Sequence, residues 1–186
     1  MIFGETTVSG VYVLDIEPQE DERGFFARTY CEREFAAHGL PARMPQASVS
    51  YTARRGTLRG LHYAAPPARE AKLVRCTAGA SFHVALDLRP GSPSFLRHAA
   101  VELLASTRRA LFVPAGCAHG VQTLEDRTEL FYQMSEFFAP ELARGVRWDD
   151  PAFGIVWPPA ERIILERDRR YPDFDPAQVA GFADYV

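Results

Sequence analysis

Lysine, cysteine and long apolar stretches are scarce in this sequence of 186 residues. The cysteines at 31, 76 and 117 are an odd number without CxxC spacing, which argues against a disulfide framework or a zinc cluster and favours a reduced, cytoplasmic protein. No apolar run approaches the roughly 18 residues that cross a bilayer, and the N-terminus lacks the features of a signal peptide. A formal net charge of −3 argues against binding to nucleic acid or to a membrane surface.

The overall composition is that of an ordinary globular protein. Apolar residues make up 47% of the chain and charged residues 24%. No repeat, low-complexity linker or change of composition divides the sequence. We therefore expect a single domain over residues 1–186.

Short β-rich runs separated by turn residues dominate the sequence. Many short strands at regular spacing indicate an all-β sandwich or barrel, here with short peripheral helices. Helices are expected at 32–37 and, by composition, at 161–170. The expected strands are 10–16, 25–30, 47–52, 57–63, 72–76, 81–88, 99–104, 110–113, 120–124 and 129–135.

Lys72 is the only lysine beside 20 arginines. Because the chain uses arginine at every other cationic position, its single lysine is informative. Lysine is a compact point charge whose pKa can be moved, whereas arginine is always charged. On this count alone, a chemical role and a structural role for Lys72 both stay open.

His62 lies in a predicted strand, and strand geometry restricts its neighbours. Side chains alternate between the two faces of a strand, so His62 should share a face with Leu58 and Gly60. Arg59 should then point to the opposite face unless a bulge intervenes. A catalytic base and a hydrogen-bonded core histidine are the two interpretations of His62.

His119 ends the segment PAGCAH at 114–119, whose PxGxxH spacing resembles the second half of the cupin barrel motif. In metal-binding cupins this histidine is a ligand, and a His-x-His pair precedes it. Here His62 is followed by Tyr63 and Ala64, so the pair is missing. Metal sites need three or four suitable ligands, and this sequence offers one or two. We expect a cupin-like barrel without a metal.

The sequence contains no GxGxxG, no GxxxxGK[ST] and no GxSxG motif, so nothing indicates a nucleotide cofactor or a serine nucleophile. Histidine, lysine and tyrosine in one barrel suit proton abstraction next to a carbonyl group. The histidine removes the proton, a cation holds the enolate oxygen, and an acid on the other face returns a proton.

Several longer segments carry a family resemblance; LRGLH and WxDP are specific, whereas PxGxxHG alone marks only a cupin. They are 21–26 (DERGFF), 58–63 (LRGLHY), 72–75 (KLVR), 87–89 (DLR) with 91–93 (GSP), 114–120 (PAGCAHG), and 147–151 (RWDDP) with Ile155 and 157–158 (WP). In these segments the sequence resembles the dTDP-4-dehydrorhamnose 3,5-epimerase family, whose fold is a cupin jelly roll.

The resemblance implies a catalytic role for four residues. It makes His62 the base and Asp168 the carboxylate that orients it, which fixes the tautomer of the imidazole. It makes Tyr132 the acid on the opposite face of the sugar and places Lys72 near the developing enolate. Without the resemblance, Asp168 would be interpreted as a solvated charge and Tyr132 as a packed strand residue.

The resemblance also implies a nucleotide-diphosphate sugar as substrate, no cofactor, and a homodimer whose N-terminal strands extend onto the partner sheet. Arg23 and Arg59 match residues that contact the diphosphate or the sugar, and forked guanidinium groups suit phosphate oxygens. The other residues implied in substrate binding are Phe26, Gln46, Ser48, His119, Phe138 and Arg167.

The sequence departs from the family pattern around this site. Asparagine is usual where Ser48 stands, tyrosine where Phe138 stands, and aspartate where His83 stands. His83 could be a second titrating group near the substrate or a packed strand residue. The other departures are at Arg28 and Ala143, which are usually acidic, and at Cys117, which is usually phenylalanine.

The base and the acid are therefore complete, while groups that select the nucleotide and the epimerised carbon are altered. The expected function is inversion of C3 and/or C5 of a dTDP-4-keto-6-deoxyhexose through an enolate. One alternative is a C3-only or C5-only epimerase acting on a CDP- or GDP-linked 4-keto sugar. A metal-dependent cupin and a non-catalytic sugar-nucleotide binder are alternatives from other classes.

Overall fold

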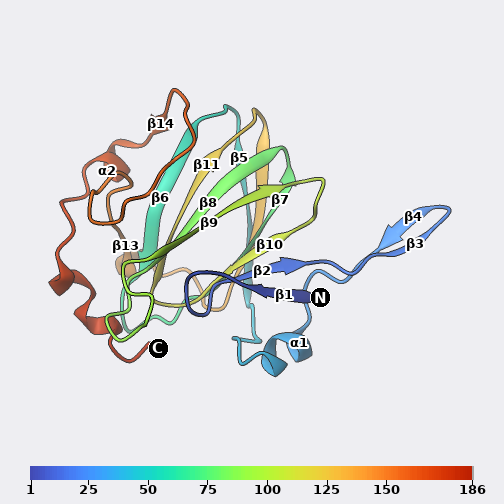
Figure 1. The fold of residues 1–186 in the computed structure, drawn as a ribbon, viewed down its shortest axis with the longest axis horizontal. Coiled ribbons are helices and arrows are strands. Elements are labelled where there is room, and N and C mark those ends of the chain that lie inside the picture. The colour runs from blue at the N-terminus through green and yellow to red at the C-terminus, as the bar shows by residue number, and fades with distance from the viewer. Residues whose placement is uncertain (186) are drawn as a thin grey trace.

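The computed structural model describes residues 1–185 and shows two antiparallel sheets that face each other (Figure 1). The first sheet has the strand order β1 (Ile2–Glu5), β2 (Tyr12–Asp15), β10 (Ala110–Val113), β7 (Lys72–Ala78), β12 (Thr128–Met134) and β5 (Gln46–Thr52). The second has the order β13 (Ala143–Gly145), β6 (Thr57–Ala64), β11 (Cys117–Thr123), β8 (Ala80–Asp87) and β9 (His98–Leu104). The two-residue strand β14 (Ile163–Ile164) joins the second sheet beside β6.

The helices are short and peripheral, as the sequence predicts. They are α1 (Glu32–Ala37), α2 (Glu166–Arg169) and the 3-10 helices η1 (Pro140–Leu142) and η2 (Pro176–Phe182). In the described part of the chain, no helix has both the length and the apolar character needed to cross a membrane. The all-β fold class is confirmed.

Three predicted elements are longer in the sequence analysis than in the structure. The helix expected at 161–170 covers only Glu166–Arg169, because the β-branched Ile163 and Ile164 pair in parallel with β6. The run 25–30 gives only β4 (Gly24–Phe26), since its partner β3 (Gln19–Asp21) is three residues long. The run 10–16 is a strand only at Tyr12–Asp15, which pairs with β1 along its length and with β10 as far as Leu14.

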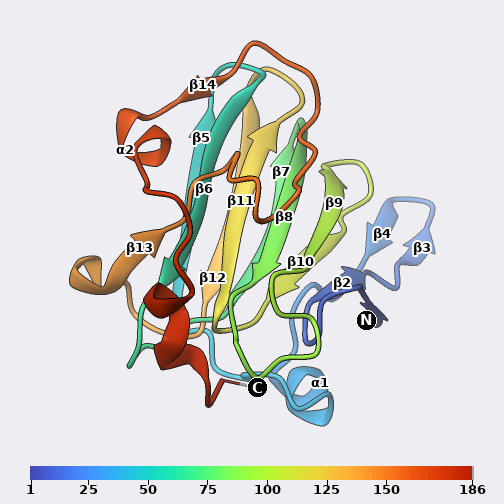
Figure 2. The ribbon, with the colours of Figure 1, turned by 60° about the vertical axis from the view of Figure 1, so that its left-hand side comes forward.

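Apolar side chains fill the space between the sheets and also cover the outer face of the second sheet. The inner core takes residues from both sheets, such as Val74 on β7 and Ala85 on β8. On β8 the alternate residues Val84 and Leu86 point outward, where Trp157 and other residues of the C-terminal segment cover them. Figure 2 shows this segment running across the outer face of the second sheet.

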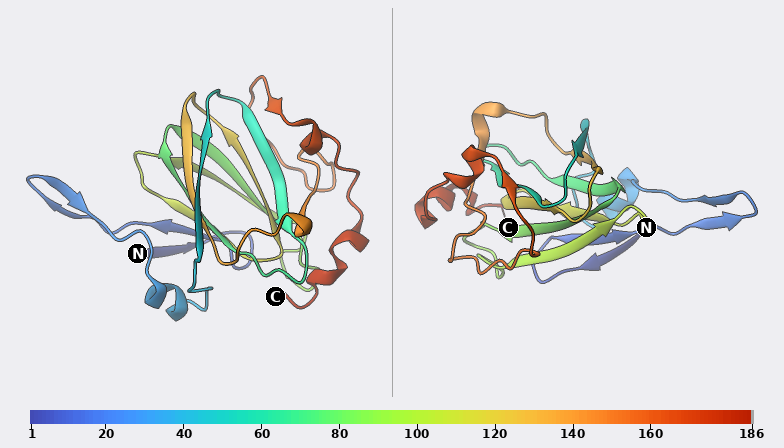
Figure 3. Two further views of the ribbon diagram at one scale, coloured as in Figure 1. Left: turned by 180° about the vertical axis from the view of Figure 1, so that it is seen from behind. Right: turned by 90° about the horizontal axis from the view of Figure 1, so that it is seen from above.

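The β3–β4 hairpin is the one element that leaves the barrel, extending away from both sheets in the views of Figure 3. Its strands pair only with each other. All six residues of the two strands are exposed to solvent. Within the described residues of its own chain, the hairpin therefore pairs with no barrel strand, although the Arg108 guanidinium lies 5.8 Å from the centroid of the Phe25 ring.

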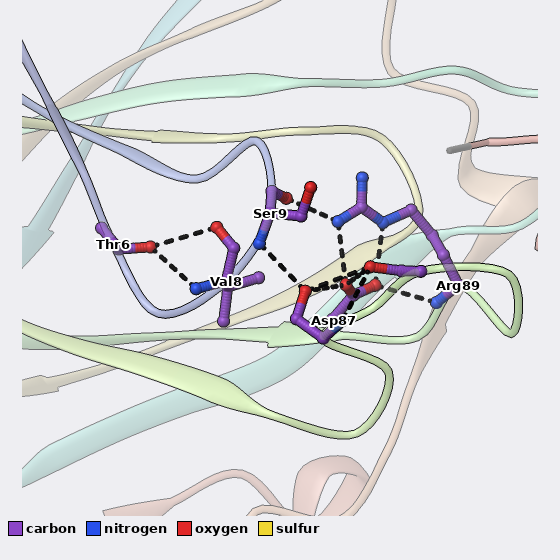
Figure 4. A network of polar contacts seen from close by, with 7 residues as sticks. Thr6, Val8, Ser9, Asp87 and Arg89 are labelled. Carbon is purple, nitrogen blue, oxygen red and sulfur yellow. Dashed lines mark hydrogen bonds and ion pairs between the residues drawn. The ribbon is translucent and has the colours of Figure 1, made fainter.

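Asp87, at the end of β8, is the centre of a buried polar network (Figure 4). Its carboxylate accepts hydrogen bonds from the Arg89 guanidinium at 2.8 and 2.9 Å and from the Ser94 hydroxyl at 2.6 Å. Arg89 also donates to the carbonyl of Ser9, so the network ties the turn after β1 to the connection between β8 and β9. Burial alone would raise the pKa of Asp87, but the hydrogen bonds from Arg89 and the serines outweigh it and lower that pKa.

Replacing Asp87 with asparagine should cost about 3 kcal/mol of unfolding free energy, because it leaves the Arg89 charge buried without its partner. Since its native pKa is lowered, the carboxylate contributes stability above its unfolded pKa of about 3.9, and this contribution disappears as the pH falls through the native value. Urea unfolding at pH 7 and at pH 3 measures both effects. The control is Asp15→Asn, which breaks the more exposed Asp15–Arg109 pair and should cost less than about 1 kcal/mol. Equal losses from the two variants would contradict a special role for the Asp87 network.

Candidate active site

His62 on β6 and Asp168 in α2 form a hydrogen-bonded pair although 106 positions separate them in the chain. Pairing of β14 with β6 brings α2 over the sheet, and Asp168 is 1% exposed there. The His62 Nε2 atom lies 2.9 Å from the Asp168 carboxylate, which also accepts from the Gly60 backbone N–H at 3.1 Å. A carboxylate can only accept, so Nε2 carries a proton, and in the neutral form of the ring Nδ1 is the basic nitrogen.

Arg167 lies beside this pair. Its Nε donates to the Asp168 carboxylate at 3.1 Å, and a terminal nitrogen is 3.1 Å from His62 Nε2. Two donors cannot share a hydrogen bond, so the second contact is only the close approach of a cation. Burial would raise the pKa of Asp168, but its bonds to His62, Gly60 and Arg167 outweigh burial and lower that pKa, which keeps it ionised.

Arg59 points into the same space as His62, which corrects the expectation from strict alternation. His62 is opposite His119 on β11, but Arg59 is opposite Val121, so β6 carries one extra residue between these pairs. The bulge is at Gly60, where Leu61 takes the core position. A bulge is the exception that strand alternation allows, and β6 contains one.

Gly60 permits this bulge because it has no side chain. A Cβ atom at Gly60 would lie 2.6 Å from the Cα of Gly120 on the neighbouring strand β11. The φ angle of Gly60 is +125°, a value that residues with a Cβ rarely adopt. Both the backbone angle and the close approach of β11 therefore require glycine.

A cavity of about 250 Å³ lies between the two sheets and collects the predicted catalytic residues. His62 faces it from β6 in the second sheet, whereas Tyr132 on β12 and Lys72 on β7 face it from the first sheet. The Lys72 ammonium is held 3.0 Å from the Glu70 carboxylate. The other predicted residues in its lining are Arg59, His119, Arg167 and Asp168.

A second cavity of about 390 Å³ continues the first, sharing His62, Lys72, Tyr132 and Arg167 with it. Phe138 lines this second space. Small-molecule sites commonly occupy roughly 300–1,000 Å³. The two cavities together are large enough for a sugar and part of the group attached to it.

Four predicted binding residues are not in the lining of either cavity. Gln46 accepts a hydrogen bond from the backbone N–H of Phe138 at 2.8 Å, so it supports the wall of the second cavity, and Ser48 follows it on β5. Arg23 and Phe26 lie on the β3–β4 hairpin, where Arg23 pairs with Asp21 and its side chain is 84% exposed. The structure does not bring Arg23 or Phe26 to the cavity of their own chain.

Among the lining residues that the sequence did not indicate are Ser50, Glu70 and Tyr171. Ser50 was recognisable, because it shares a strand face with Gln46 and Ser48. Glu70 could have been suspected two residues before the single lysine. Tyr171, whose ring centroid is 6.4 Å from that of His62, follows α2 and carries no recognisable pattern.

Two facing sheets with a histidine–carboxylate pair on one and a tyrosine on the other define a cupin-type barrel equipped for proton transfer. The family model for dTDP-4-dehydrorhamnose 3,5-epimerase matches residues 5–176. The dTDP-4-dehydrorhamnose 3,5-epimerase of Pseudomonas aeruginosa is 43% identical over 162 residues, which are 85% of this chain and 88% of that protein. The chain therefore belongs to the dTDP-4-dehydrorhamnose 3,5-epimerase family.

Solved structures of the family share the fold. The crystal structure of the dTDP-4-dehydrorhamnose 3,5-epimerase from Elizabethkingia anophelis superposes with a TM-score of 0.92 and 32% identity, over 96% of this chain and 98% of that one. The epimerase RmlC from Legionella pneumophila, solved in complex with dTDP-4-keto-L-rhamnose, gives 0.83 and 30% over 90% of this chain and 89% of that one. The cupin-like barrel expected from the sequence is confirmed.

Gly60→Ala should destabilise the protein through the close approach of β11. Overpacking of this kind costs about 1–3 kcal/mol in addition to the strain of the positive φ angle. Gly24→Ala is a matched control, since Gly24 has a φ of +127° but no atom within 4 Å of the point that a Cβ would occupy. Chemical unfolding of both variants isolates the contact, and equal stabilities would show that the contact with Gly120 is unimportant.

Proposed function

We propose that the protein inverts carbons next to the C4 ketone of a dTDP-4-keto-6-deoxyhexose, at C3 and C5, through an enolate. The observation that carries this proposal is the position of His62 and Tyr132 on opposite sheets, on either side of one cavity. A sugar bound between them would have one ring face toward a base and the other toward an acid. The ligand in the Legionella pneumophila relative is a sugar nucleotide of this class.

Proton removal falls to His62. Its Nδ1 is the unprotonated nitrogen, and it takes the proton from the carbon next to the ketone while the C–H electrons move to form the enolate. The imidazolium that results is stabilised by the Asp168 carboxylate at 2.9 Å. The pair therefore fixes the tautomer before the reaction and balances the charge after proton transfer.

Lys72 stabilises the enolate oxygen. Its ammonium lies on the same sheet as Tyr132, in the lining shared by both cavities. A preorganised charge or donor at a developing oxyanion is worth roughly 3–4 kcal/mol. The ion pair with Glu70 holds the ammonium group in place.

Tyr132 completes the inversion by giving its phenolic proton to the carbon from the opposite face. One proton has then moved to His62 and one has left Tyr132, so the sugar is unchanged in composition and inverted at one centre. Exchange of both side chains with water restores the enzyme. The cycle repeats at the second carbon, and Arg59 and Arg167 supply positive charge for the diphosphate.

Isotope exchange separates the two proton transfers. His62→Ala should lower deuterium incorporation from solvent by roughly 10²–10⁴-fold, whereas Tyr132→Phe should slow inversion more than exchange. NMR of dTDP-4-keto-6-deoxyglucose in deuterated water follows both rates and shows whether C3, C5 or both carbons exchange. Tyr12→Phe, on the β2 strand away from the cavity, is the control for loss of a tyrosine hydroxyl. Undiminished exchange in His62→Ala would remove His62 from the role of base.

We propose further that the active unit is a homodimer in which the hairpin of one protomer completes the cavity of the other. Arg23 and Phe26 belong to the family pattern, yet they lie on a hairpin that extends away from their own cavity (Figure 3). Within the first sheet, the edge strand β5 exposes Val49 and Tyr51, which are 58% and 56% accessible. An exposed apolar edge is a natural place for a second copy to pair.

Mixed dimers test this arrangement. Arg23→Ala and His62→Ala homodimers should each be impaired, and random exchange of their subunits should restore about a quarter of the wild-type activity, since half of the dimers are mixed and each has one intact site. The control mixes His62→Ala with Tyr132→Phe, whose side chains share one cavity, and should restore nothing. No recovery in the first mixture would mean that Arg23 acts within its own chain or not at all.

A further inference from the structure

Three polar side chains lie in a row behind the wall of the cavity. Ser81 and His83 are on β8, and His119 is on the adjacent strand β11 (Figure 1). The Ser81 hydroxyl is 2.9 Å from His83 Nε2, and His83 Nδ1 is 2.9 Å from His119 Nε2. Ser81 and His83 are completely buried, whereas His119 lines the cavity with His62 and Lys72. The mechanism above uses neither Ser81 nor His83.

Both rings in this row are neutral. Burial lowers the pKa of His83 to about 3. The pKa of His119 is well below its usual value, first because the ring is buried and then because His83, Lys72 and His62 are close to it. A neutral imidazole has one N–H and one lone pair, so it donates on one side and accepts on the other. The two hydrogen bonds of the row must therefore point in the same direction.

The Ser81 end decides this direction. In the inward direction, His119 donates to His83 and His83 donates to Ser81, so the Ser81 hydroxyl would need another acceptor. The candidates are the Leu103 carbonyl, which is 3.4 Å away and a poor partner, and the Cys76 sulfur, which is a weak acceptor. If the row points outward, Ser81 donates to His83 at 2.9 Å, and His83 Nδ1–H donates to His119 Nε2. His119 then carries its own proton on Nδ1.

The Nδ1 atom of His119 has no hydrogen-bond partner among the described residues. Every buried side-chain nitrogen or oxygen in this part of the chain has such a partner, so Nδ1 is not a buried atom. Nδ1 is therefore open to the cavity that His119 lines. An N–H group at this position can donate to an oxygen of a bound ligand. The Leu103 carbonyl at the far end has no proton to give, so the row can orient a donor but cannot deliver a net proton.

We propose that Ser81 and His83 are positioning residues that hold His119 as the neutral Nδ1–H tautomer, with its N–H directed at a sugar oxygen beside Lys72. The identity of the acceptor as a sugar oxygen rests on the proposed function. The tautomer itself does not, because the row is complete in the protein alone.

Other ionisable groups surround the row and define what could disturb it. His119 shares its cavity with cations on several elements and with the hydrogen-bonded pair of His62 and Asp168. Cys76 on β7 lies beside Ser81 and donates to the backbone carbonyls of Ala78 and Gly79. The groups that line the cavity with His119 are Arg59 and His62 on β6, Lys72 on β7, Tyr132 on β12, and Arg167 and Asp168 in α2.

Two substitutions of equal size reverse or keep the direction of the row. In His83→Asn, the amide nitrogen can replace Nδ1 as the donor to His119, so the Nδ1–H tautomer should persist. In His83→Asp, the carboxylate can only accept a hydrogen bond. His119 must then donate to it from Nε2–H, which leaves Nδ1 without a proton on the side that faces the cavity. Long-range ¹H–¹⁵N NMR of the ligand-free proteins reads the tautomer directly. Ser81→Ala, which removes the proton that sets the direction, should give a mixture of tautomers.

The same pair of variants should differ in catalysis. Loss of one donor at a developing oxyanion lowers kcat by about 10²-fold, and we expect this loss in the aspartate variant but less than about tenfold in the asparagine variant. Lowering the pH should reduce the difference in kcat between the two variants, because in the aspartate variant the carboxylate then favours a doubly protonated His119 that regains its Nδ1–H. A merely structural role for His83 would instead give two variants with the same pH profile.

The outcomes separate this proposal from the proposed function. An Nε2–H tautomer of His119 in the unsubstituted protein would overturn the proposal, and so would equal tautomers and equal rates in the two variants. If the protein turned over no 4-keto sugar, the proposed function would fail while the NMR result could still stand. Unfolding curves of both variants show whether either has lost its fold. If one has, Ser81→Ala, which retains His83, provides the test.

Discussion

The site depends on the contact between Gly60 and Gly120, where β6 and β11 meet with no side chain between them. This contact allows the one-residue bulge in β6, and the bulge turns both Arg59 and His62 toward the cavity. The Gly60 N–H also binds the Asp168 carboxylate, so the same backbone position holds the partner of the base. A side chain at Gly60 would push the strands apart and move the base relative to the acid on the facing sheet, whereas a side chain at Gly120 would meet Trp157 and Leu61.

Much of the fold could be predicted because alternation and turn residues specify it locally. The runs between residues 47 and 135 become strands β5 to β12, since each has a buried face and a partner on both sides or at a sheet edge. The site residues His62, Lys72, Tyr132 and Asp168 came from the family resemblance together with the single-lysine count. Periodicity alone would have left Asp168 on the surface, although it is 1% exposed. Its burial depends on β14 pairing with β6, a contact between segments about 100 residues apart.

The features that escaped prediction depend on tertiary contacts that no local pattern specifies. The bulge at Gly60 results from the approach of β11, and strand periodicity has no information on that approach. The placement of Arg23 outside its own cavity follows from a hairpin whose two strands pair only with each other. His83 looked like either a titrating group or a packed residue. It is buried in the row behind His119, so it is a hydrogen-bonding residue that does not titrate near neutral pH.

The charge balance of the cavity explains why a neutral row is useful there. Arg59, Arg167 and Lys72 line the first cavity together with one carboxylate, Asp168, so this cavity has an excess of positive charge that suits a diphosphate, whereas Glu70 and Glu136 line the second cavity. A carboxylate at position 83 would add a negative charge behind the cavity wall and would offset part of that excess. With histidine there instead, His119 contributes a dipole and no net charge. In the proposed mechanism Lys72 is then the cation at the enolate oxygen, and the enolate is stabilised by this ammonium group together with the N–H that we propose for His119.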